Sequence, residues 1–179
     1  TVFDKSKDVI ETIKKENLCS NVSLDIQSAV KDSDLIILAI PLSSYKEVLL
    51  SAKDTFKKGA IITDTGSVKK EVNKIFENLN LTNISWIASH PIAGTEHSGA
   101  KNALQGLFEG KWCILTPFNK RHENIKKFSE LWKYIGMEIA TMPVDEHDKI
   151  MSITSHLPHL IAFTIVNTAF KIDIKKKRE

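Results

Sequence analysis

The residues best suited to chemistry gather around a histidine at the end of a short apolar segment. Residues 85–89 are small or apolar, His90 follows them, and Pro91 comes next. Proline lacks the N–H that a β-ladder needs, so this pattern predicts a strand that ends at His90. Ligands bind at the carboxyl ends of strands in open α/β sheets. The placement predicts binding or acid–base chemistry at His90; a histidine that only packs or caps is the alternative.

A second polar turn lies upstream. The apolar residues 61–63 end in Asp64, Gly66 allows a turn, and Ser67 is predicted to cap the helix that follows. If the two strands are parallel neighbours, Ser67 and His90 share one edge of the sheet. A hydroxyl and an imidazole placed in this way are able to contact the same substrate oxygen.

Four motifs occur in a fixed order: DTGSVK at 64–69, SHPIAGTEHSG at 89–99, GKWCILTP at 110–117 and SHLPH at 155–159. Together they resemble the prephenate dehydrogenases of tyrosine biosynthesis, over essentially the whole chain. The resemblance implies NAD as cofactor and oxidative decarboxylation of prephenate to 4-hydroxyphenylpyruvate. It also implies a small-molecule substrate and a homodimer, if the helical domain is complete.

The resemblance assigns roles to individual residues. His90 accepts the hydrogen bond from the ring hydroxyl, and Ser67 orients both His90 and the substrate. The predicted substrate-binding residues are Thr95, Glu96, His156 and His159. The predicted cofactor-binding residues are Asp4, Pro41, Leu42, Asp64 and Ser67.

The cofactor-binding role of Asp4 is also predicted from the local sequence pattern, independently of the resemblance. Residues 1–4 read as the end of a strand that closes in an acid, the position that binds ribose hydroxyls in dinucleotide-binding units. An acid there repels a 2′-phosphate and favours NAD over NADP; a helix-capping aspartate is the alternative. The first strand and its G-x-G-x-x-G loop are then expected before residue 1, because none of the seven glycines has that spacing.

Strand and helix patterns alternate along most of the chain. This alternation predicts a doubly wound parallel, Rossmann-like α/β sheet that lacks its first strand and glycine loop. We expect an incomplete dinucleotide-binding domain at 1–143, then one long helix at 144–170 that Pro158 kinks, and a basic tail at 171–179. The helix is expected to begin a truncated helical dimerisation and substrate domain, because its apolar second half needs a partner.

Composition narrows the class of protein. The chain has 179 residues, 42% of them hydrophobic, and a net charge of +3 that the tail alone supplies. A charged terminal run is more often solvated than bound to nucleic acid, so no nucleic-acid partner is predicted. No apolar run of about 18 residues and no signal peptide is apparent, so we expect a cytoplasmic protein without membrane contact. Cys19 and Cys113 lack disulfide or zinc spacing, and no metal site is expected at His147, His156 and His159.

Two alternatives remain open at this point. The chain could be a non-catalytic remnant, or one that depends on another polypeptide for the missing parts. It could also be an arogenate dehydrogenase or another NAD-linked hydroxyacid dehydrogenase on the same scaffold, since the keto or amino group of the substrate leaves no trace in these motifs.

Overall fold

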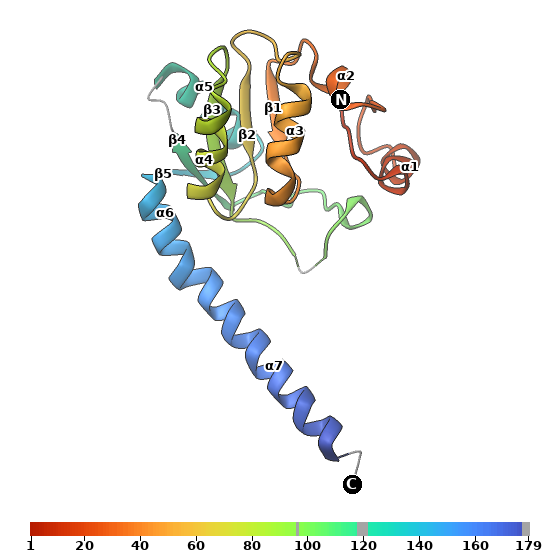
Figure 1. Cartoon of the computed structure of the whole chain (residues 1–179), viewed down its shortest axis with the longest axis vertical. Helices are drawn as coiled ribbons and strands as arrows, with labels where there is room; N and C mark the ends of the chain where they lie inside the picture. The colour runs from red at the N-terminus through yellow and green to blue at the C-terminus, as the bar shows by residue number, and fades with distance from the viewer. Residues whose placement is uncertain (96, 118–121, 177–179) are drawn as a thin grey trace.

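The computed structural model describes residues 1–95, 97–117 and 122–176. A sheet domain carries a long helical rod that leads away from it (Figure 1). The strands are β1 (Leu35–Leu38), β2 (Ile61–Asp64), β3 (Ser85–Pro91), β4 (Trp112–Pro117) and β5 (Glu138–Thr141). The α-helices are α1 (Lys7–Lys15), α2 (Ile26–Val30), α3 (Tyr45–Ala52), α4 (Lys70–Leu79), α5 (His122–Tyr134), α6 (Val144–Met151) and α7 (Leu157–Lys176). Shorter turns are η1 (Leu42–Ser44), η2 (Ala100–Asn102) and the π-helical η3 (Ser152–His156).

The five strands lie in sequence order, but the sheet is mixed. β1, β2 and β3 are parallel, β4 runs antiparallel to β3, and β5 is parallel to β4. The prediction of a wholly parallel sheet is therefore wrong at β4. A parallel neighbour needs a crossover, usually a helix. In the described residues of the segment 92–111 the only element is the η2 turn, and the chain re-enters the sheet at Trp112, with Cys113 opposite Pro91.

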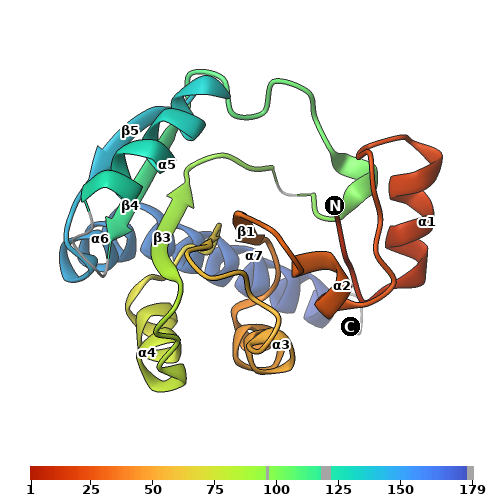
Figure 2. The ribbon, with the colours of Figure 1, turned by 90° about the horizontal axis from the view of Figure 1, so that it is seen from above.

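Helices cover both faces of the sheet, as predicted for a Rossmann-like fold. Figure 2 shows α3 and α4 side by side on one face. Trp86 of β3 points into that layer and stacks on Phe76 of α4, with 3.6 Å between the ring centroids. The next residue, Ile87, points to the opposite face and packs with Phe128 of α5. The alternation of side chains along β3 thus divides the interior into two apolar cores.

The start of α4 differs from the prediction. The helix begins at Lys70 and its N-cap position is Lys69, so Ser67 is not the capping residue. Instead, the carboxylate of Asp148 in α6 accepts hydrogen bonds from the backbone N–H groups of Lys69 and Lys70, both at 2.9 Å. An acid at a helix N-terminus satisfies free N–H groups and complements the helix dipole. A distant side chain therefore does the capping that was predicted for a local one.

The rod consists of three helical segments. α6, the π-helical η3 and α7 follow one another without a break (Figure 1). The predicted single helix is therefore continuous, but it is π-helical just before Pro158, whose ring nitrogen has no hydrogen to donate to the carbonyl of Thr154. α7 also continues to Lys176, past the limit predicted at residue 170, and 177–179 lie outside the described residues.

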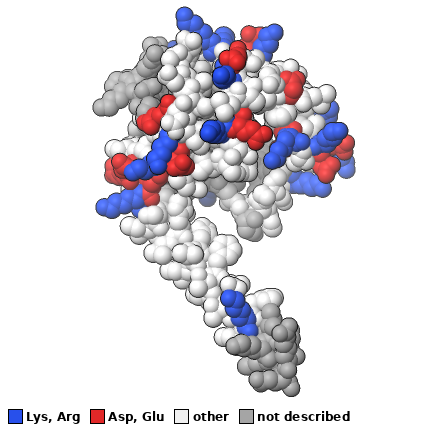
Figure 3. All heavy atoms as spheres, viewed as in Figure 1, with Lys and Arg blue, Asp and Glu red and all other residues white. Residues whose placement is uncertain are grey.

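The surface of α7 is mostly apolar and exposed. Figure 3 shows mixed charges over the sheet domain and a largely uncharged rod. Its exposed large side chains include Leu160, Phe163, Ile165, Val166 and Phe170. By length and composition alone, Val144–Ile172 is long and apolar enough to cross a membrane, whereas the sequence pattern predicted no such segment. The same test is passed by a helix that packs against a partner.

β1 forms one edge of the described sheet. It pairs with β2, where the carbonyl of Asp34 accepts the N–H of Ile61 at 2.9 Å and that of Leu38 accepts the N–H of Thr65 at 3.2 Å. In the ranges that the structure describes, no strand flanks its other side. That side faces a groove of about 260 Å³ between β1 and the N-terminal segment. Residues that line the groove include Phe3, Asp4, Val30, Ile36, Ile40 and Pro41.

Candidate active site

His90 is the last residue but one of β3, which ends at Pro91, one residue later than predicted. Its side chain is only 9% exposed, and its Nδ1 lies 2.9 Å from Nε2 of His147 in α6. Burial, with the nearby charges of His147 and Lys69, lowers the pKa of His90 to about 4. The imidazole is therefore neutral at pH 7 and has one nitrogen that accepts a proton.

His147 connects His90 to a carboxylate. It is fully buried, and its Nδ1 lies 2.7 Å from Oδ1 of Asp148, the next residue. Burial lowers the pKa of His147, against the opposing effect of Asp148. Burial raises the pKa of Asp148, but hydrogen bonds from the N–H groups of Lys69 and Lys70, together with His147, lower the pKa overall. The result is a chain of an ionised acid and two neutral imidazoles.

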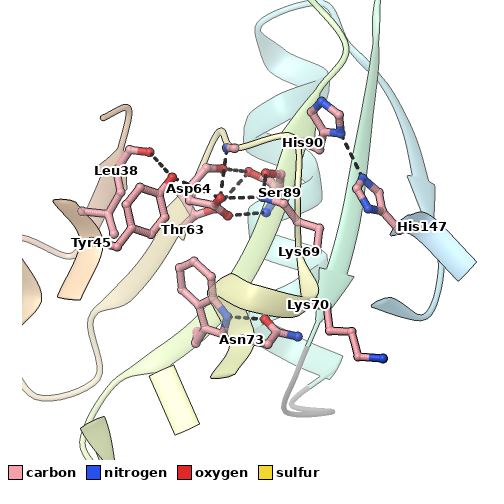
Figure 4. A network of polar contacts seen from close by, with 12 residues as sticks. Leu38, Tyr45, Thr63, Asp64, Lys69, Lys70, Asn73, Ser89, His90 and His147 are labelled. Carbon is pink, nitrogen blue, oxygen red and sulfur yellow. Dashed lines mark hydrogen bonds and ion pairs between the residues drawn. The ribbon is translucent and has the colours of Figure 1, made fainter. Parts of the chain in front are cut away.

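A buried ion pair lies directly below His90 (Figure 4). Nζ of Lys69 is 2.5 Å from Oδ2 of Asp64 and 2.7 Å from the carbonyl oxygen of Ser89, and both charged side chains are fully buried. The carboxylate of Asp64 also accepts hydrogen bonds from the Tyr45 hydroxyl and from the backbone N–H groups of Gly66 and Ser89. This network joins the ends of β2 and β3 and fixes the backbone that carries His90.

The close approach at Gly66 explains the glycine in the DTG motif. A Cβ atom at position 66 would lie 2.9 Å from Oδ2 of Asp64 and 3.3 Å from the Tyr45 hydroxyl. Any side chain there would displace the carboxylate from the ion pair. The motif thus serves the buried network under the site.

The predicted catalytic and substrate-binding residues differ in how far they are buried. Ser67 is exposed in the turn after β2, and no hydrogen bond joins it to His90 among the described residues. Thr95 lies exposed in the loop after β3, where its hydroxyl accepts the N–H of His97 at 3.2 Å. Glu96 lies outside the described residues.

The histidines of the SHLPH motif lie on the rod beside the sheet. His156 is half-buried at the end of η3, and its charge is among the causes that lower the pKa of His90. His159 is exposed in the first turn of α7, with Nδ1 at 2.8 Å from the carbonyl oxygen of Ser155. In the part of the chain that the structure describes, no three metal-binding side chains cluster.

The predicted cofactor residues divide into two sets. Asp4 and Pro41 both line the groove beside β1, and Oδ1 of Asp4 accepts the N–H of Ser6 at 2.8 Å. Leu42 is partly buried and packs against the apolar core to which α3 contributes Tyr45 and Leu49. Asp64 is fully buried, so its side chain serves the interior network and does not reach the surface.

Four residues that support His90 were not predicted from the sequence to do so. Lys69, Tyr45, His147 and Asp148 all hold the groups around His90 in place. The one available signal was the pair His147–Asp148 at the start of a helix that follows the last strand. Burial of Lys69 left no signal, since a lysine near a helix start is usually solvated.

The fold and the site define a class. A doubly wound sheet with a groove and polar side chains at the carboxyl ends of its strands is typical of the nucleotide-binding domains of dehydrogenases. The profile described as "Prephenate dehydrogenase, nucleotide-binding domain" matches residues 1–141, and "Prephenate dehydrogenase, dimerization domain" matches residues 143–178. The chain belongs to the prephenate dehydrogenase family.

Individual relatives agree with this membership. The chain is 38% identical to a cyclohexadienyl dehydrogenase of Zymomonas mobilis over 93% of its own length and 57% of the relative. It is 30% identical to a prephenate dehydrogenase of Lactococcus lactis, over 92% of this chain and 46% of that protein. The structure of Aquifex aeolicus prephenate dehydrogenase with hydroxyphenyl propionate and NAD⁺ matches with a TM-score of 0.83 and 31% identity, covering 93% of this chain and 58% of that chain. The chain therefore spans about half the length of the relatives it matches.

Proposed function

We propose that this chain carries the cofactor groove and the reactive histidine of an NAD-dependent prephenate dehydrogenase. The observation that carries the proposal is the buried, neutral His90 at the end of β3, held by His147. The names of the matched relatives and the ligands of the Aquifex aeolicus structure support the same activity. The substrate is then prephenate, which is oxidised and decarboxylated to 4-hydroxyphenylpyruvate.

His90 acts in this reaction as the acceptor for the hydroxyl proton. As hydride leaves the ring carbon that bears the hydroxyl, the oxygen gains carbonyl character and its proton moves toward Nε2 of His90. Loss of carbon dioxide then makes the ring aromatic, and the proton returns to the oxygen as the phenol forms. A neutral imidazole accepts the proton near pH 7, and the imidazolium that forms returns it to the oxygen. We propose Ser67, Thr95, Glu96, His156 and His159 as the residues that orient the substrate around it.

The groove beside β1 fits one part of NAD. Most of its lining residues are apolar, and Asp4 supplies a carboxylate near the start of the chain, the chemistry that recognises ribose hydroxyls. NAD, when bound, accepts the hydride. Asp4 and Pro41 are the residues of this groove that we propose to hold it, and the negative charge of Asp4 favours NAD over NADP.

Titration with NADH, followed by its fluorescence, tests this proposal. We expect saturable binding in the micromolar range, weaker binding of NADPH, and tighter binding of NADH when prephenate or arogenate is present, with prephenate the better of the two. Asp4→Asn keeps the turn with Ser6 but removes the charge. A charge-assisted hydrogen bond contributes about 1.5–3 kcal/mol, so Asp4→Asn should weaken NADH binding by about tenfold or more and narrow the gap to NADPH.

Asp8→Asn is the matched control, because Asp8 is an exposed acid in the first turn of the neighbouring helix α1. It should leave both affinities unchanged. No saturation at millimolar NADH would contradict the proposed cofactor site, and equal effects of the two substitutions would contradict the role of Asp4.

We also propose that α7 is covered in a cytoplasmic homodimer. The match of residues 143–178 to a dimerisation domain and the exposed apolar side chains of α7 support this. Sedimentation of the chain should give a dimer, and Phe163→Asp should give a monomer, because a carboxylate is costly to bury in an apolar contact. Tyr134→Asp on α5 is the control, since Tyr134 is 89% exposed and lies outside α7. A monomeric parent chain at micromolar concentration would exclude this dimer.

A further inference from the structure

We propose that His147 and Asp148 are positioning residues that set the tautomer of His90. They hold the proton on Nδ1 of His90 and leave the lone pair on Nε2. The inference rests on the proposed function in one respect, namely that Nε2 is the atom that meets the substrate hydroxyl. The direction of the hydrogen bonds follows from the contacts and from the neutral state of both rings.

Asp148 is an ionised acceptor. Its carboxylate sits at the N-terminus of α4 and accepts the backbone N–H groups of Lys69 and Lys70 at 2.9 Å. Two such donors favour the ionised form, and an ionised carboxylate only accepts hydrogen bonds. Nδ1 of His147, 2.7 Å from Oδ1 of Asp148, must therefore be the donor.

The proton on Nδ1 of His147 decides the next bond. A neutral imidazole with a proton on Nδ1 has an acceptor at Nε2. Nε2 of His147 lies 2.9 Å from Nδ1 of His90, so Nδ1 of His90 must donate. Nε2 of His90 is then unprotonated, and no described residue forms a hydrogen bond with it.

The groups around His90 and His147 keep both imidazole rings neutral, and the hydrogen-bond directions given above require this. Both histidines are buried, and two cationic or titratable groups, Lys69 and His156, oppose a further positive charge on His90. The acids that face the pair are Asp148, which bonds to His147, and Asp64, which is already paired with Lys69. The contact also fixes the ring, because turning the His90 imidazole over would replace Nδ1 by a carbon and lose the bond to His147.

Nitrogen NMR of the chain labelled at its imidazole nitrogens tests the tautomer directly at neutral pH. We expect His90 to show a protonated, pyrrole-type Nδ1 and a pyridine-type Nε2, and His147 to show a protonated Nδ1. His147→Phe removes the acceptor, so the preference of His90 for Nδ1–H should be lost. His147→Gln restores a carbonyl oxygen that accepts the bond and should retain it. Asp145→Asn, an exposed position on the same helix that pairs with Lys70, is the control.

Turnover gives the second readout. His147→Phe should lower kcat at least about tenfold, with KM nearly unchanged, and by no more than the loss of His90 itself, which is about 10²- to 10⁴-fold for a general base. His147→Gln should recover part of this loss, whereas a residue that only fills space would show no such rescue.

The two proposals fail in different ways. A protonated Nε2 on His90 in the parent chain, or an unchanged tautomer in His147→Phe, would overturn the inference whatever the activity. The predicted tautomers in a chain that neither binds NADH nor turns over prephenate would leave the inference standing and overturn the proposed function. The measurement on the parent chain needs no substitution, so it holds even if His147→Phe fails to fold.

Discussion

His90→Asn is expected to lower kcat with prephenate and NAD⁺ by about 10²- to 10⁴-fold, the usual contribution of a general base. Asparagine offers no basic nitrogen, and its amide cannot take the hydroxyl proton. The affinity for NADH should change little, because His90 lies at the end of β3 and the groove that we assign to the cofactor lies beside β1. Steady-state rates and the fluorescence titration give the two quantities separately.

Ser67→Ala is the comparison for this variant, and it should lose less of the rate than His90→Asn. The pH dependence of kcat/KM tests the protonation state of His90. Because burial holds the pKa of His90 at about 4, kcat/KM should stay level as pH falls from 8 to 5 and decline only below that. A decline near pH 6.5, or full activity in His90→Asn, would contradict the role of His90.

Lys69→Met is expected to lower the free energy of unfolding by about 3–5 kcal/mol, the usual effect of breaking a buried ion pair on one side. Lys69 and Asp64 are both fully buried, and methionine would leave the carboxylate without its cation. Urea unfolding followed by circular dichroism measures the change. The double variant with Asp64→Leu should recover only part of it, because Tyr45 and the N–H of Ser89 would lose their acceptor.

Lys57→Met provides a matched comparison. Nζ of Lys57 lies 2.6 Å from Asp34, nearly the same separation, but the two side chains are 46% and 86% exposed. Surface pairs contribute about 0–1 kcal/mol, so this substitution should have a small effect. If the two lysine variants unfold at the same urea concentration, the network under His90 does not stabilise the fold as described.

The sequence predicted the features that depend on neighbouring residues. Pro91 marks the end of β3 because proline cannot continue the ladder, and this placed His90 correctly at the edge of the sheet. The acid and glycine of the DTG motif marked the end of β2 in the same way. The motifs around these strand ends also identified the family, which the profile match over residues 1–141 confirms.

Features that depend on distant residues were not predictable from these patterns. The cap of α4 comes from Asp148, 79 residues away from Lys69, so a search for a local capping residue selected Ser67 instead. The direction of β4 depends on how the segment 92–111 returns to the sheet, and no periodic pattern records this. Contacts across the fold overrode local preference in both cases.

The open edge of β1 has a consequence for local stability. Residues 34, 36 and 38 turn their backbone groups toward β2, so by alternation Leu35 and Ile37 turn theirs toward the groove. In terms of amide hydrogen exchange, one strand therefore holds two classes of proton. In the described fold, those of Ile36 and Leu38 are released only when the sheet opens, whereas those of Leu35 and Ile37 face the groove without a partner strand and should exchange faster. Within the described residues, the boundary between protected and exchanging amides therefore runs along the length of β1 and not across its end.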